Sequence, residues 1–168
     1  MHLRTAIACL AAAASAAAVC ADAAPSPASP VRRCAPVRPD AGAVERQDAL
    51  RCLLNDTRRR RGRTKLRFSV TLQRAAQRLL SVSCRRSTAG CGGAFEAVLS
   101  AVLRARHYNG RVQYVYYDVS DSPAAVAAYI RSNQSWLSSG RYRDLGIAFR
   151  PGGASSKSAW IVIAGYRF

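Results

Sequence analysis

Histidine and acidic residues are scarce in this sequence, which holds two histidines and nine aspartates and glutamates among 168 residues. Only His107 lies outside the N-terminal 23 residues. A lone histidine just after a helix is most often a solvent or packing residue, although it can act as a general acid or base. No Gly-x-Ser-x-Gly or other nucleophile motif accompanies it. The sequence therefore predicts no catalytic residues and a protein that is not an enzyme.

Long apolar runs are also missing, apart from one at the N-terminus. The run Ala6–Val19 is too short for a transmembrane helix. Arg4 before it and Ala21-Asp22-Ala23 after it have the form of a secretory leader. We expect residues 1–23 to be a signal peptide, and the mature protein to be secreted or periplasmic with no transmembrane segment.

Four cysteines remain after the expected cleavage. An even number in an exported chain indicates two disulfides, with buried free thiols as the alternative. Three pairings of the four are possible. They are Cys34, Cys52, Cys84 and Cys91.

The charge of the chain is strongly positive, with a formal net charge of +17 at pH 7. Lys65 and Lys157 are the only lysines, so nearly all of this charge is arginine. A surface this basic attracts polyanions at low salt. Outside the cytoplasm these are cell-wall polymers, anionic lipid head groups or acidic glycans. A specific nucleic-acid partner conflicts with the expected leader.

The most conspicuous basic run allows two interpretations. It is either the solvated end of a helix or an anion-binding patch. The candidate anion-binding residues are Arg58, Arg59, Arg60, Arg61, Arg63, Lys65 and Arg67.

The spacing of apolar residues predicts an α+β fold, because helices are followed by alternating strands without βαβ units. Ser69 and Ser122 are expected N-caps, the second followed by a proline at the first helical position. Gly62 is the expected stop of the first helix. A proline-rich arm over 24–42 precedes the domain. We expect helices over 43–61, 70–83, 95–106 and 124–133, a polar loop over 84–93, and strands over 111–119, 145–150 and 159–168.

Four blocks in order resemble the CAP superfamily of cysteine-rich secretory, antigen 5 and pathogenesis-related proteins, in its small bacterial form. The first block is the helix–crossing–helix stretch Leu50–Leu80, and the others are His107–Val112, Ser122–Val126 and Arg141–Ala148. The resemblance implies that residues 43–168 form an α-β-α sandwich with a three-stranded antiparallel sheet between helices. The favoured pairing is Cys34–Cys52, which also occurs in similar bacterial proteins, together with Cys84–Cys91, which would close a local loop.

The residues of the family's cleft are absent at the matching positions. Where the family has histidine, glutamate and histidine, this chain has Cys91, Tyr114 and one of Asn133, Gln134 and Ser135. The preceding helix contains no acid. A divalent metal needs converging imidazoles and carboxylates, so we expect no metal and no cofactor.

These observations predict a secreted, basic, CAP-like domain that binds an anionic envelope polymer or lipid head group without catalysis, as a monomer. One alternative is a hydrolase with an unrecognised site around His107. Another is a cationic effector that disrupts membranes.

Overall fold

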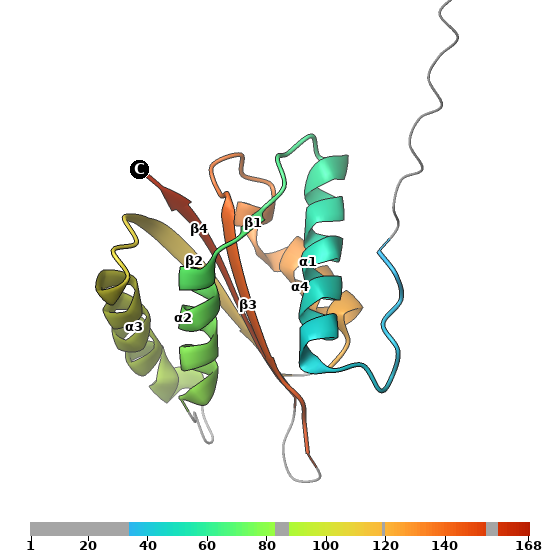
Figure 1. The fold of residues 1–168 in the computed structure, drawn as a ribbon, viewed down its shortest axis with the longest axis horizontal. Helices are drawn as coiled ribbons and strands as arrows, with labels where there is room; N and C mark the ends of the chain where they lie inside the picture. Colours follow the sequence, from blue (N-terminus) through green and yellow to red (C-terminus); the bar gives the residue numbers. More distant parts are fainter. Residues whose placement is uncertain (1–33, 83–87, 119, 154–157) are drawn as a thin grey trace, which may run out of the picture. The chain divides into compact units, whose positions relative to one another are not determined.

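A computed structural model of the protein describes residues 34–82, 88–118, 120–153 and 158–168, and of residues 88–94 the backbone alone. The described elements belong to one unit, Arg33–Phe168 (Figure 1). In chain order they are α1 (Ala43–Arg60), β1 (Arg67–Phe68), α2 (Val70–Ser81), α3 (Thr88–Ala105), β2 (Gly110–Tyr117), α4 (Pro123–Asn133), the 3-10 turn η1 (Ser135–Leu137), β3 (Asp144–Arg150) and β4 (Ala159–Arg167).

The sheet has four strands in the order β1-β3-β4-β2. Strands β2, β4 and β3 are antiparallel neighbours, whereas the two-residue strand β1 pairs parallel with β3. The α+β class is confirmed, but the expectation of three antiparallel strands is wrong. The crossing from α1 to α2 passes the edge of the sheet and stays extended there, because Arg67 N–H donates to the Arg143 carbonyl and Ser69 N–H to that of Leu145.

Helices cover both faces of this sheet, with α2 and α3 on one side and α1, α4 and η1 on the other (Figure 1). The core therefore forms two clusters. Leu50 and Leu54 of α1 and Trp136 of η1 pack on one face, and Leu72 and Leu79 of α2 pack on the other, all fully buried. Successive side chains of β2 point to opposite faces of the sheet, so they are divided between the two clusters.

The helix starts follow the expected caps. Ser69 Oγ accepts the N–H of Leu72, and Ser122 Oγ accepts the N–H of Ala125. The third helix corrects the sequence analysis, because it begins at Thr88 and not near Phe95. Three glycines between these residues indicated a loop, yet helix formation is cooperative and extends upstream from the apolar part of α3. No helix in the described ranges is long and apolar enough to cross a membrane.

Candidate functional site

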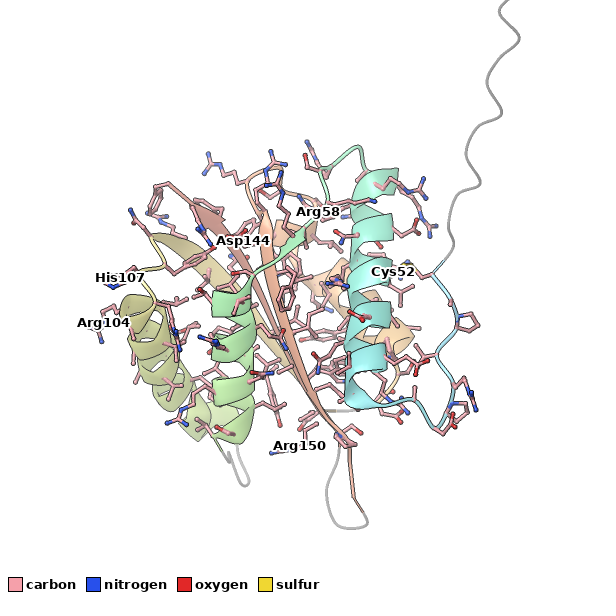
Figure 2. The ribbon with its side chains drawn as sticks, in the orientation of Figure 1. Cys52, Arg58, Arg104, His107, Asp144 and Arg150 are labelled. Carbon is pink, nitrogen blue, oxygen red and sulfur yellow. A yellow bond between two sulfur atoms is a disulfide. The ribbon has the colours of Figure 1, made fainter. Side chains whose placement is uncertain are left out.

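Arg58 is the first residue of the basic run, and it is fully buried at the end of α1 (Figure 2). Its guanidinium donates only to backbone carbonyls. The acceptors are those of Thr64 at 2.8 Å, Trp136 at 3.2 Å, Leu137 at 3.2 Å, Ser139 at 2.9 Å and Tyr142 at 3.0 Å.

This geometry removes Arg58 from the predicted anion-binding patch. A planar guanidinium carries five N–H donors in a fixed fork and therefore serves several carbonyls at once. Burial lowers the pKa of Arg58, and the positive charges of Arg143 and Arg63 lower it further. Arg58 is a structural clamp that joins the end of α1 to η1 and to the segment between η1 and β3.

The next two arginines of the run share one ion-pair partner. Asp56 forms ion pairs with Arg59 and Arg60, one and two positions along the run from Arg58. Hydrogen bonds from Arg59 and then from Arg60 lower the pKa of the Asp56 carboxyl. Arg61 instead donates to the hydroxyl of Ser138, across from η1. The run is thus split into one buried, two paired and one outward-reaching arginine.

Exposed cations from two distant segments meet at the end of the molecule where β3 begins. The Arg63 guanidinium lies beside Gly140, and the backbone of Arg67 bonds to that of Arg143. None of these side chains forms an ion pair within the described residues. We define the basic rim as the exposed residues Arg61, Arg63, Lys65, Arg67, Arg141 and Arg143.

A hollow of about 450 Å³ adjoins the basic rim. Two arginines line it, Arg111 from β2 and Arg141 from the loop before β3. Neither is ion-paired in the described part of the chain. We call this the arginine hollow. Its remaining lining is Val112, Gln113, Ser135, Trp136, Ser139, Tyr142 and Tyr166.

The register of the sheet explains how these residues come together. Arg111 of β2 lies opposite Tyr166 of β4, so both side chains stand on the same face. The ring of Tyr166 meets that of Tyr142 edge-on at 5.3 Å. Trp136 packs at 6.4 Å from Tyr142 and is fully buried. Its indole N–H is the one buried side-chain donor without a partner among the described residues.

The electrostatics of the arginine hollow centre on Tyr142. Burial raises the pKa of Tyr142, and the neighbouring Tyr166 raises it too, whereas Arg111 and Arg141 lower it. Both arginines therefore lie close enough to the phenol to stabilise negative charge there. An anion placed beside this hydroxyl would meet the same two positive charges.

The four predicted cleft positions with described side chains do not all converge. Tyr114 and Ser135 lie on opposite faces of the sheet, since Tyr114 packs edge-on against Phe95 of α3 at 6.0 Å. Only Ser135 lines the arginine hollow. Asn133 is exposed and donates to the Tyr129 carbonyl, and Gln134 is half-buried between α4 and η1. The side chain of Cys91 lies outside the described part.

The described cysteines and His107 do not line the arginine hollow. A disulfide joins Cys34 to Cys52, with their Cα atoms 5.7 Å apart, which confirms the first predicted pair. The pair Cys84–Cys91 lies outside the described side chains. His107 is exposed just beyond the end of α3 (Figure 2) and does not line the arginine hollow. Among the described residues no three of His, Cys, Asp and Glu gather closely enough to hold a metal.

The residues of the arginine hollow were missed by sequence reasoning. Period-two alternation on β2 places Arg111 and Gln113 on one face and Tyr114 on the other. That signal was present, but it does not say which face meets η1. Arg141 and Tyr166 had no local signal, because they reach the hollow through pairing between distant strands.

The fold is similar to that of two solved structures. A cysteine-rich secretory protein from Staphylococcus aureus aligns with a TM-score of 0.58 at 17% identity, over 78% of this chain and 41% of that one. An outer surface protein from Borrelia burgdorferi aligns with a TM-score of 0.53 at 13% identity, over 74% of this chain and 94% of that one. The chain spans less than half the length of the staphylococcal protein. No protein family profile and no curated protein matches the chain.

Proposed function

We propose that this chain is an extracellular, non-catalytic CAP-like domain whose basic rim binds an anionic component of the cell envelope. One observation carries the proposal. Six exposed cations from two segments far apart in sequence share one end of the fold, and none of them is ion-paired within the described residues. Folding brings these like charges together, and a bound polyanion relieves their repulsion.

The rim contrasts with the adjacent arginines of α1. Arg59 and Arg60 share the Asp56 carboxylate, so their positive charge is partly compensated within the protein. The rim residues have no such carboxylate among the described residues. The Arg58 clamp fixes the chain segments on which the rim residues stand. A preformed site of this kind loses little conformational freedom when it binds.

An extracellular location supports an envelope ligand. The two structural neighbours are named as a secreted and an outer surface protein. The Cys34–Cys52 disulfide is typical of an oxidising compartment, and the sequence predicts a secretory leader. Polymers and lipids bearing phosphate or carboxylate are the anions that such a protein meets at high local concentration.

The test compares two triple variants with the same change in net charge. One carries Arg63→Glu, Lys65→Glu and Arg67→Glu in the basic rim. The control carries Arg74→Glu, Arg78→Glu and Arg150→Glu, all exposed and outside the rim, with Arg150 at the opposite end of the molecule from Arg58 (Figure 2). Binding to polyphosphate and to phosphatidylglycerol vesicles is measured from low to high salt, and circular dichroism checks that both variants fold.

The proposal expects the rim variant to bind at least about tenfold more weakly, and the control to stay within about threefold of the wild type. The affinity of the wild type should fall steeply with salt. If both variants lose affinity equally, net charge alone explains the binding, and the basic rim is not the binding site. Leakage of the vesicles on binding would replace the proposal with a membrane-disrupting effector. Turnover of a ligand that His107→Ala abolishes, with the fold intact, would replace it with an enzyme.

A further inference from the structure

We propose that the arginine hollow binds one anionic sugar unit, a pyranose ring that carries a carboxylate or a phosphate. The inference rests on the proposed function, because such a unit is a building block of anionic envelope polymers. It adds a discrete site with defined chemistry to the diffuse attraction of the basic rim.

The anionic part of the ligand follows from the two arginines. Arg111 and Arg141 both act electrostatically on the hydroxyl of Tyr142. No acidic residue lines the hollow, and neither arginine has an ion-pair partner within the described residues. The guanidinium fork matches the paired oxygens of a carboxylate or phosphate group. These arginines are therefore placed to hold one such group between them.

The ring follows from the aromatic walls. Tyr142 and Tyr166 meet at an interplanar angle of 87°, and the fully buried indole of Trp136 packs behind Tyr142 with ring centroids 6.4 Å apart. The two half-buried tyrosine rings offer apolar surface against which the C–H face of a pyranose packs. The amide of Gln113 and the hydroxyls of Ser135 and Ser139 add donors and acceptors for ring hydroxyls. The hollow thus combines aromatic rings with several polar and charged groups.

The size of the hollow agrees with a single unit of a longer chain. Its volume of about 450 Å³ lies within the roughly 300–1,000 Å³ of typical ligand sites. Arg141 belongs both to the hollow and to the basic rim. A polymer whose terminal unit occupies the hollow can therefore continue along the rim.

The two tryptophans provide a direct readout by nuclear magnetic resonance. Trp136 lines the hollow, and its buried indole N–H has no partner among the described residues, whereas that of Trp160 donates to the Ser120 carbonyl at 2.9 Å. Glucose 1-phosphate and glucuronic acid are titrated into the oxidised protein, and Trp136→Phe assigns the two indole signals. The proposal expects the Trp136 signal to shift and saturate with both probes while the Trp160 signal stays in place.

Matched variants locate the charge that matters. Arg141→Gln removes a cation of the hollow and should weaken the binding of both probes at least tenfold. Arg143→Gln removes an exposed cation two residues away that does not line the hollow, and should change binding less than threefold. Equal effects of these two changes would overturn the assigned site.

Two further arms test the ligand class. Neutral glucose and inorganic phosphate should each bind at least tenfold more weakly than glucose 1-phosphate. If inorganic phosphate binds as tightly as glucose 1-phosphate, the proposed sugar specificity is wrong. If the Trp136 signal does not move at millimolar concentrations of the probes, the proposed site is wrong. The Arg63, Lys65 and Arg67 triple variant should keep its sugar binding. In the wild type, polyphosphate binding without sugar binding refutes this inference alone, and sugar binding without polyphosphate binding refutes the proposed function alone.

Discussion

Gly62 and His107 occupy the same position beyond the ends of two different helices. Both have left-handed backbone conformations, with φ of 64° and 49°. In each case the next residue donates its N–H to a carbonyl five positions back, Arg63 to Arg58 at 2.8 Å and Tyr108 to Leu103 at 2.9 Å. This is the Schellman ending of a helix, for which glycine is the preferred residue. At α3 a histidine bears the conformational cost.

His107→Gly should therefore stabilise the protein by about 0.5–1 kcal/mol, because glycine adopts the left-handed region without a steric penalty. Urea unfolding at neutral pH measures the change. His107→Ala keeps a Cβ in the same backbone conformation and should leave stability nearly unchanged. At the matching position, Gly62→Ala should cost about 1 kcal/mol, although no atom lies within 4 Å of the added Cβ. A destabilised His107→Gly protein would show that the imidazole itself holds the turn.

The Arg58 clamp should dominate the stability of the basic run. Arg58→Ala leaves five carbonyls without this donor, those of Trp136 and Leu137 in buried surroundings, and a loss of about 3–5 kcal/mol is expected from removing a buried charge with its hydrogen bonds. Arg58→Lys should recover only part of that, since an ammonium has three donors. Arg59→Ala, in the neighbouring position, removes a surface ion pair and should cost less than about 1 kcal/mol. Urea unfolding ranks the three, and similar losses for Arg58→Ala and Arg59→Ala would contradict the clamp.

The Cys34–Cys52 disulfide should stabilise the domain by restricting its unfolded chain. It closes a loop of 18 residues, for which about 2–4 kcal/mol is expected. The double variant Cys34→Ser, Cys52→Ser should lose this amount in chemical unfolding under oxidising conditions. Stability equal to that of the wild type would mean that Arg46, which donates to the Pro39 and Ala41 carbonyls, anchors the arm alone.

The same variant also tests the other predicted disulfide. With Cys34 and Cys52 replaced, a reducing agent should lower the stability further if Cys84 and Cys91 are bonded. No further change on reduction would show that they are free thiols. A quadruple variant that also carries Cys84→Ser and Cys91→Ser, with and without the reducing agent, is the control for effects of the reductant on anything other than these sulfurs.

Tyr108 should make the protein sensitive to alkali. Burial raises the pKa of its phenol, and the negative charge of Asp144, which accepts its hydrogen bond at 3.0 Å, raises it further. The folded state therefore retains this proton more tightly than the unfolded state. Its contribution is full below the unfolded pKa of about 10 and is lost as pH rises beyond that value.

Urea unfolding at pH 8 and at pH 11 measures this loss. Tyr108→Phe should be less stable than the wild type at pH 8 and should lose less stability between the two pH values. Tyr129→Phe, which alters an exposed tyrosine of α4, is the control. A Tyr108→Phe protein with the wild-type pH dependence would contradict the assigned role of the phenol.

Helices were the most predictable part of the fold. Leu72, Ala75, Ala76 and Leu79 share one face by their spacing alone, and all four are fully buried in the structure. Ser69 and Ser122 marked helix starts because capping is a local interaction. The parallel strand β1 was not predictable, because two residues carry no periodicity and their pairing depends on β3.

The candidate site was far less predictable, because its geometry is long-range. Arg58 cannot be told from Arg59 in a run of arginines, yet four of its five acceptors lie 78 to 84 residues away. Tyr114 was matched to a cleft position by family likeness, but the register of β2 turns it toward α3. Residues that meet only through strand pairing leave no pattern in the sequence of either strand.

The choice of partner for Arg58 has a consequence for acidic surroundings. An ion pair with a carboxylate would weaken once that carboxylate took up a proton. Carbonyl oxygens do not titrate, and a guanidinium keeps its proton throughout the range in which proteins fold. The connection that Arg58 makes between α1 and the segments around η1 is therefore insensitive to acid, while the Asp56 ion pairs are not. Acidification should loosen the surface of this domain before it loosens its centre.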